Sequence, residues 1–142
     1  MLHVAAQGDE AYSLAYFRHK GISVMSRDNG GSTPLHWACA AGSDTASYYL
    51  MSWEVDVNAV DAHGKTPLHL AVHYSYKFGT TRTTKELLIR GADRDAKEYL
   101  ENKKPIDITE TLQDNETRDE LRQILIKPKF LLPCCHFRIP MV

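Results

Sequence analysis

The segments "STPLHWACAAG" (residues 32–42) and "KTPLHLAVHYS" (residues 65–75) share the four residues Thr-Pro-Leu-His. The two copies begin at Thr33 and Thr66, which lie 33 residues apart. One interval before the first copy, a leucine, a histidine and an alanine stand at matching positions, as Leu2, His3 and Ala5. Because residue identity and spacing recur together, the sequence predicts an array of repeated structural units.

A weaker fourth copy, "KKPIDIT" (residues 103–109), places Pro105 38 residues after Pro67. The third unit is therefore five residues longer than the others. Four of the five fall between Leu68 and Gly91, and an extended loop between two helices is their simplest place. The insertion is either a tolerated surface loop or an added wall of a binding surface, because three aromatic residues cluster there, Tyr74, Tyr76 and Phe78.

Local chemistry predicts a pair of helices in each unit. Threonine followed by proline is typical of a helix N-terminus, so helices should begin after Thr33 and Thr66. The segments 44–53 and 83–91 supply a second apolar helix, and glycines such as Gly91 suit helix C-termini. A pair of short helices cannot bury its apolar face alone, so stacking of successive pairs should create one continuous core.

The 33-residue period with Thr-Pro-Leu-His-x-Ala resembles the ankyrin-repeat family over roughly residues 2–126. The resemblance implies an all-α solenoid of four helix-turn-helix repeats with short β-hairpin loops. The repeats would span about residues 1–27, 28–60, 61–97 and 98–126, followed by a tail at 127–142. The first repeat lacks Thr-Pro and the last has Asp107 in place of histidine, as expected of capping units with polar outer faces.

Composition narrows the class of function. The 142 residues include 17 basic and 18 acidic ones, for a net charge of −1, so a basic nucleic-acid footprint is absent. No apolar run reaches the roughly 18 residues of a membrane helix. The three cysteines, of which two are adjacent, are a poor disulfide framework, which favours free thiols in a reducing compartment. We therefore expect a cytoplasmic protein.

The sequence contains no recognisable catalytic or phosphate-binding motif. Of the seven histidines, His3, His36 and His69 occupy the same repeat position, so each has a structural explanation. His63 and His73 lack partners at metal-ligand spacing, and Cys134 to His136 is too short a cluster to form a zinc site alone. We expect no catalysis, metal, cofactor or small-molecule substrate in this chain.

Ankyrin-repeat proteins bind partners on the concave side of the stack, which is formed by the hairpin tips and the inner faces of the first helices. The resemblance therefore implies that this chain binds a protein or an extended peptide segment there. The corresponding positions in this sequence are Asn29, Ser32, Trp37, Ala40, Ala41, Val60, Ala62, His63, Lys65, His73 and Tyr74. Alternatively, these residues are ordinary solvated tips and a partner docks elsewhere.

Trp37 is larger than its counterpart Leu70, and its indole N–H requires a hydrogen-bond partner. It is either a core filler or a groove residue. "GSTPLHWACAAG" resembles the ankyrin arms of membrane-bound DHHC-type protein S-acyltransferases (palmitoyltransferases). In that family a tryptophan at this position packs against an extended substrate segment containing Gln-Pro. Gly8 stands near the position of an asparagine that completes the family's pocket, so the sequence departs from the pattern there.

The tail "LIKPKFLLPCCHFRIPMV" (residues 125–142) is apolar with interspersed basic residues and three prolines that forbid a long helix. It either packs on the last repeat as a cap or leads into a membrane segment beyond residue 142. In the second case Cys134 and Cys135 are candidates for lipidation, and membrane attachment would arise only through the missing C-terminal region.

Three functional interpretations remain open. The chain is a protein-binding module without chemistry of its own, the substrate-recruiting arm of a membrane-bound palmitoyltransferase, or a structural scaffold that only spaces other domains. A palmitoyltransferase parent would place the chain at the cytosolic face of an internal membrane.

Overall fold

The computed structural model describes residues 1–126 and forms eight α-helices and one short 3-10 helix over that range. None of those residues is in a β-strand. The elements in chain order are α1 (Leu2–Gln7), α2 (Ala11–His19), α3 (Pro34–Ala41), α4 (Asp44–Ser52), α5 (Pro67–Phe78), α6 (Arg82–Ile89), α7 (Pro105–Ile108), η1 (Thr109–Thr111) and α8 (Asn115–Ile126).

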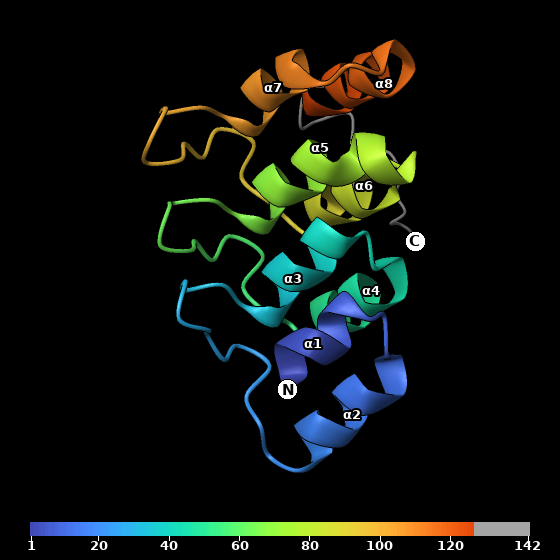
Figure 1. Ribbon diagram of the computed structural model, residues 1–142, viewed down its shortest axis with the longest axis vertical. Helices are drawn as coiled ribbons and strands as arrows, with labels where there is room; N and C mark the ends of the chain where they lie inside the picture. Colours follow the sequence, from blue (N-terminus) through green and yellow to red (C-terminus); the bar gives the residue numbers. More distant parts are fainter. Residues whose placement is uncertain (127–142) are drawn as a thin grey trace, which may run out of the picture.

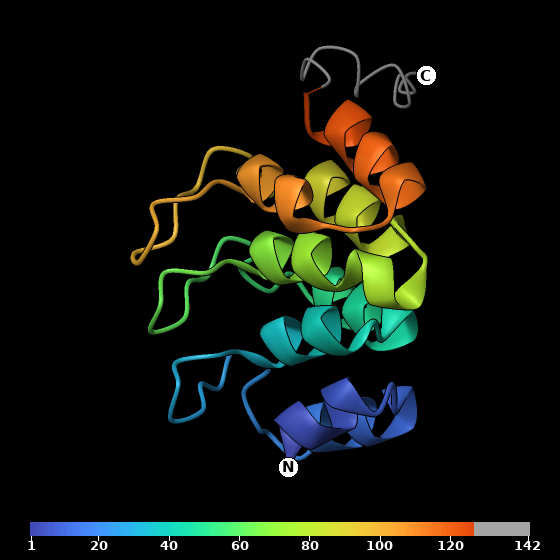
Figure 2. The ribbon, with the colours of Figure 1, turned by 45° about the horizontal axis from the view of Figure 1, so that its top comes forward.

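The helices stack in two rows (Figure 1). The first helices of the units, α1, α3, α5 and α7, pack successively on one another, and α2, α4 and α6 pack in sequence behind them. The last helix, α8, packs against α5 and α7. Three long loops project to one side of the stack, as the tilted view in Figure 2 makes plain. The predicted all-α solenoid is thus confirmed.

One continuous apolar core runs through the stack. Leu35 and Leu68 of the Thr-Pro-Leu-His segments are 1% and 0% exposed, and Ala38 and Ala71 let neighbouring helices approach closely. Each second helix buries one leucine completely, namely Leu14, Leu50, Leu87 and Leu121. Burial of each such leucine contributes about 1.5–3 kcal/mol, so helices too short to be stable alone are held by packing.

The repeated histidine joins successive units. The Nδ1 atom of His36 accepts the backbone N–H of Thr33 at 3.1 Å, within a capping box in which Pro34 opens α3. Because Nδ1 is an acceptor, the proton of the neutral imidazole lies on Nε2, which donates to the carbonyl oxygen of Lys65 in the next unit at 2.9 Å. His69 repeats this arrangement, accepting from Thr66 and bonding the Lys103 carbonyl oxygen at 3.1 Å.

The first and last units each form part of this hydrogen-bond arrangement. His3 places Nε2 2.9 Å from the carbonyl oxygen of Ser32, so the first junction is bridged although the unit lacks Thr-Pro. In the fourth unit Asp107 accepts the N–H of Lys104 at 2.9 Å, as histidine Nδ1 does elsewhere. A carboxylate has no N–H with which to reach a further unit.

The insertion in the third unit is helical, and our prediction of an extended loop was wrong. Helix α5 has 12 residues where α3 has 8, and both end at a glycine in the left-handed conformation, Gly79 and Gly42. Four residues make about one turn of α-helix, so the added turn continues the face that already packs on the core. Ser75 accordingly lies buried one turn after Val72. The fifth residue lies in the third tip, where the Glu98 N–H bonds the Lys103 carbonyl oxygen.

The predicted hairpins are tight turns, and neighbouring tips touch. A hydrogen bond from the Asp28 N–H to the Ser32 carbonyl oxygen closes the first tip, and the N–H of Ala62 in the second tip donates to the carbonyl oxygen of Gly30 at 2.9 Å. A Cβ at Gly31 would lie 3.1 Å from the Ala62 nitrogen, so a side chain at that position would crowd the contact. Glycine is therefore needed where the tips approach.

We expect His69→Ala to destabilise the chain by about 1–3 kcal/mol, because the buried Thr66 N–H would lose its partner and the Lys103 carbonyl oxygen would keep only the Glu98 N–H. Chemical denaturation followed by circular dichroism measures this. The control is His63→Ala, which removes an exposed imidazole. Equal midpoints for wild type and His69→Ala would contradict the bridging role.

Stability should also fall on acidification. Burial, partly offset by hydrogen bonds to Lys65 and Lys103, lowers the pKa of His36 and of His69 below the ordinary 6.5. The unfolded chain then binds more protons, so the free energy of unfolding decreases as the pH falls through about 6.5 toward the lowered folded values. We expect the loss between pH 7.5 and 5.5 to be smaller in His69→Ala than in wild type or His63→Ala. An equal loss in all three would exclude His69 as a contributor.

Cys39 should resist alkylation in the folded chain. It is 2% exposed, and burial raises the pKa of its thiol to about 12, so almost no thiolate is present at neutral pH. Mass spectrometry after a brief pulse of iodoacetamide measures labelling of each cysteine, with the denatured chain as a control. Cys134 and Cys135 lie outside the described residues, and from the sequence we expect them to be labelled faster than Cys39 if the tail is loose. Rapid labelling of Cys39 under native conditions would contradict its burial.

Candidate functional site

An open groove of about 590 Å³ crosses the row of first helices. Its floor is made of small and aliphatic side chains from α3 and α5, and aromatic rings stand around it. Trp37 comes from α3, whereas Tyr74 and Phe78 come from α5. The full set of lining residues is Gln7, Ser32, His36, Trp37, Ala40, Ala41, Leu70, Tyr74, Lys77 and Phe78. We call this the first pocket.

Two contacts hold the ring of Trp37 in the first pocket. The indole Nε1 donates to Asp28 Oδ2 at 2.7 Å, and the imidazole of His3 meets the indole edge-on with ring centroids 5.9 Å apart. The side chain is half-buried. Since the N–H is already used within the chain, Trp37 offers a partner only the apolar surface of its ring.

Asp28 fixes the tip as well as the tryptophan. Its Oδ1 accepts the backbone N–H groups of Gly30 and Ser32, each at 2.9 Å. Partial burial acts to raise the pKa of Asp28, but these N–H groups and the Trp37 indole hold that pKa below the ordinary value. The charged carboxylate therefore ties the first tip to the ring that stands beside the groove.

The added turn of α5 forms one wall of the first pocket. A Cβ at Gly42 would lie 2.5 Å from the ring of Phe78, so this ring lies directly on the backbone at the end of α3. Lys77 lines the pocket beside Phe78, with its ammonium 5.7 Å from the ring centroid. The insertion thus shapes the groove, which favours the added wall over a tolerated surface insertion.

A second pocket of about 260 Å³ continues the groove toward α7, sharing Leu70 and Tyr74 with the first. The His73 ring meets Tyr74 edge-on, with centroids 4.7 Å apart. Burial, followed by the nearby positive charge of Lys65, lowers the pKa of His73. The remaining residues that line it are Lys65, His69, Glu98, Glu101, Lys103, Ile108 and Thr111.

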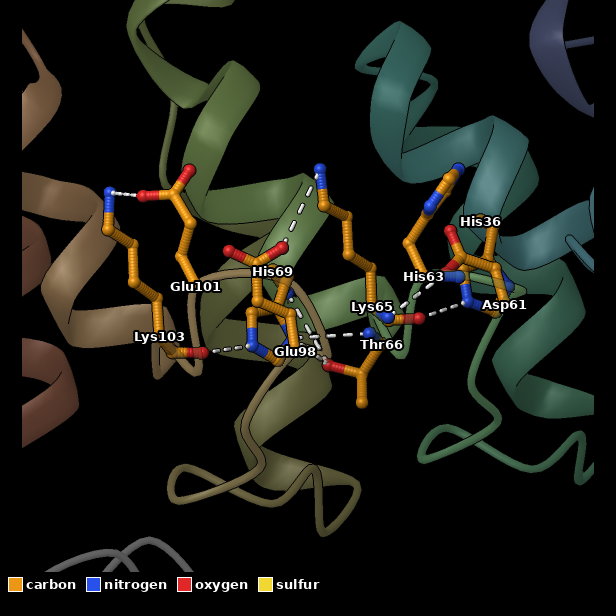
Figure 3. A network of polar contacts seen from close by, with 9 residues as sticks. All are labelled: His36, Asp61, His63, Lys65, Thr66, His69, Glu98, Glu101 and Lys103. Atoms are coloured by element: carbon orange, nitrogen blue, oxygen red, sulfur yellow. Dashed lines mark hydrogen bonds and ion pairs between the residues drawn. The ribbon is translucent and has the colours of Figure 1, made fainter.

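The charges of the second pocket are paired (Figure 3). Lys103 Nζ lies 2.6 Å from Glu101 Oε2, and Lys65 Nζ lies 3.9 Å from Glu98 Oε2. The backbone carbonyl oxygens of Lys65 and Lys103 accept from the bridging histidines, so one set of residues serves both stack and groove. Among the residues within 1–126 that line this pocket, two lysines and two glutamates therefore balance each other in charge.

Seven of the eleven predicted groove residues line one of the two pockets: Ser32, Trp37, Ala40, Ala41, Lys65, His73 and Tyr74. Asn29, Ala62, His63 and Val60 line neither pocket and are exposed. The backbone of the last three connects adjacent loops, because the Ala62 N–H bonds Gly30, the His63 carbonyl oxygen accepts from Tyr99, and the Val60 carbonyl oxygen accepts from Arg27.

Five residues that line the first pocket were not among the predicted groove residues: Gln7, His36, Leu70, Lys77 and Phe78. Phe78 had been noted as part of an aromatic cluster, but the added turn was expected to be a loop. Gln7 lies at the end of α1, one 33-residue interval before the predicted groove residue Ala40, so the repeat period is the signal that would have identified it.

Within residues 1–126, no group of three or more His, Cys, Asp or Glu side chains is arranged to hold a metal ion. No helix in the same range is long and apolar enough to cross a membrane. The tail at 127–142, with Cys134 and Cys135, lies outside the described residues.

Known proteins match this chain over its repeats. A family model for ankyrin repeats, comprising three copies, matches residues 2–98. Human "SH3 and multiple ankyrin repeat domains protein 2" is 27% identical over 99 residues, which is 70% of this chain and 5% of that protein. Human "Neurogenic locus notch homolog protein 2" is 32% identical over 101 residues, or 70% of this chain and 4% of that protein.

A third relative bears on the narrower resemblance. "Putative palmitoyltransferase ZDHHC13" of Danio rerio is 38% identical over 74 residues, which is 51% of this chain and 11% of that protein. The match fits the resemblance of the Trp37 segment to the arms of S-acyltransferases. The chain corresponds to a small part of each of these three relatives.

The family model covers more than half of the chain, and the stacked helix pairs have the architecture that the 33-residue period predicts. Ankyrin repeats are generally non-catalytic modules for protein interaction. The chain belongs to the ankyrin-repeat family.

Proposed function

We propose that this chain binds an extended segment of a partner protein along the groove of its first helices, with an apolar or proline side chain packed against Trp37. The observation that carries the proposal is the first pocket itself. It is an open cavity of about 590 Å³ with three aromatic side chains around a floor that includes Ala40 and Ala41. No catalytic step is part of the proposal.

The composition of the first pocket suits a peptide side chain. Small floor residues leave room, and aromatic walls supply a large apolar contact area at little cost in conformational entropy. Trp37 is already oriented by Asp28 and His3, so binding would not have to order its ring. Such preorganisation raises affinity because less entropy is lost on binding.

The continuity of the two pockets favours an extended ligand. Leu70 and Tyr74 line both, so a segment leaving the first pocket passes directly into the second. The polar and charged lining of the second pocket suits the backbone and polar side chains of that segment. A ligand with a single compact side chain would fill only one of the two pockets.

A second candidate function is the recruitment of substrates for a membrane-bound palmitoyltransferase, in which this chain would be a cytosolic arm. Two observations favour it: the 38% identity to the Danio rerio relative over 74 residues, and the position of Trp37 in the groove. Gly8 in place of the family asparagine leaves the Gln-Pro preference unsupported. Sequencing the transcript downstream of the Val142 codon tests this candidate. It requires apolar spans around a cysteine-rich Asp-His-His-Cys segment, and a continuing frame without them would refute it.

We expect Trp37→Ala to weaken binding of groove ligands about thirtyfold or more, since an aromatic anchor in a desolvated pocket commonly contributes 2 kcal/mol or more. Peptides selected by display on the wild-type chain, measured by titration calorimetry against both proteins, provide the test. The fold should tolerate the change better than Leu35→Ala or Leu68→Ala, because the Trp37 ring is only half-buried.

Two control variants sharpen this test. Trp53→Ala removes the other tryptophan, which lies at the end of α4 under Arg18 and lines neither pocket, so it should leave affinity unchanged. Trp37→Leu installs the residue that α5 uses at this position and should keep the fold while losing affinity. Selected peptides that bind wild type and Trp37→Ala equally would contradict the proposal, and failure to select any ligand would favour a spacing scaffold.

A further inference from the structure

The first pocket has an unbalanced charge. Among the described residues that line it, Lys77 is the only one with a formal charge at neutral pH, because burial lowers the pKa of His36 and the Thr33 N–H bonded to Nδ1 favours the neutral imidazole. None of these described lining residues is an aspartate or a glutamate. A filled first pocket would therefore place a partner beside the positive charge of Lys77, because the carboxylate of Asp28, which bonds the Trp37 indole, is not among the lining residues.

The ammonium of Lys77 has no carboxylate partner in the described part of the chain. None of the ion pairs within residues 1–126 includes it. Its recorded contact is with the ring of Phe78, 5.7 Å from the centroid. The lysines of the second pocket differ, since Lys65 and Lys103 each have a glutamate within 4 Å.

The inserted residues of α5 supply both the positive charge of Lys77 and the aromatic wall formed by Phe78. Lys77 and Phe78 both lie in the turn that lengthens α5, whereas α3 ends at Ala41 and has no corresponding turn. The inserted residues thus give the first pocket an apolar wall and a cation side by side. A ligand that uses the wall must lie close to the ammonium.

We propose that the groove selects a partner segment in which an acidic residue stands next to the apolar residue that fills the first pocket. The carboxylate lies against Lys77 while the apolar side chain packs among Trp37, Tyr74 and Phe78. A neighbouring lysine or arginine in the segment would be repelled, so the charge acts mainly on specificity. This inference rests on the proposed function of the groove.

The test begins with a display selection of random 12-residue peptides on the wild-type chain, followed by synthesis of the best ligand and of its Asp→Asn and Glu→Gln analogues. We expect aspartate or glutamate to be enriched beside the apolar anchor. Lys77→Glu should lower the affinity for the acidic peptide about tenfold, because an attraction between the two charges is replaced by a repulsion of similar size. The affinities of wild type and Lys77→Glu for the neutral analogue should agree within about twofold.

The matched control is Lys20→Glu, which makes the same change in net charge at the end of α2 and alters no residue of either pocket. It should leave the affinity for the acidic peptide unchanged. Raising the salt concentration should lower the affinity of the wild-type chain for the acidic peptide. It should have little effect on the affinity of Lys77→Ala, since salt screens an ion pair that this variant cannot form.

The outcomes separate this inference from the proposed function. Ligands that need Trp37 but show no acidic preference, or that lose equal affinity in Lys77→Glu and Lys20→Glu, would overturn the role of Lys77 and leave groove binding intact. Ligands enriched in lysine or arginine beside the anchor would also overturn it. Ligands that do not need Trp37 would contradict groove binding itself and, with it, the charge preference.

Discussion

A histidine side chain bridges each junction of the stack, and the rest of the architecture depends on that bridge. In His36 and His69, Nδ1 accepts a backbone N–H at the start of the helix and Nε2 reaches a carbonyl oxygen of the following tip. One side chain thereby sets the start of a helix and the position of the next tip. Because both ring nitrogens are used and the ring is buried, protonation or truncation leaves buried backbone groups unpaired.

The histidine hydrogen bonds also position residues that line the groove. The carbonyl oxygen that His36 binds belongs to Lys65, whose side chain lines the second pocket, and the one that His69 binds belongs to Lys103, which lines it too. In the first pocket the tip residue Asp28 holds the ring of Trp37. Groove geometry is thus set by the packing of the repeats, and one added turn of α5 then makes the first pocket different from its neighbour.

Periodicity made most of the fold predictable. Positions that recur every 33 residues, such as Leu35 and Leu68, are the buried ones, since every unit meets its neighbours in the same way. Features that depart from the 33-residue period were harder to predict from the sequence. The insertion before Gly79 was expected to be a loop, because residue composition alone did not indicate that the helical face continues through Ser75. Asn29 and His63 were assigned as tip residues from family positions and do lie on exposed tips, but they line neither pocket.

The most direct test of the account is to locate a bound ligand. Nuclear magnetic resonance of the chain with its best display-selected peptide would give intermolecular contacts between ring protons and ligand protons. We expect contacts from Trp37, Tyr74 and Phe78 to one apolar side chain of the peptide, with further contacts running toward His73. Contacts confined to the exposed tyrosines of α2 and α4, such as Tyr12, would contradict it, because they would place recognition on the second helices.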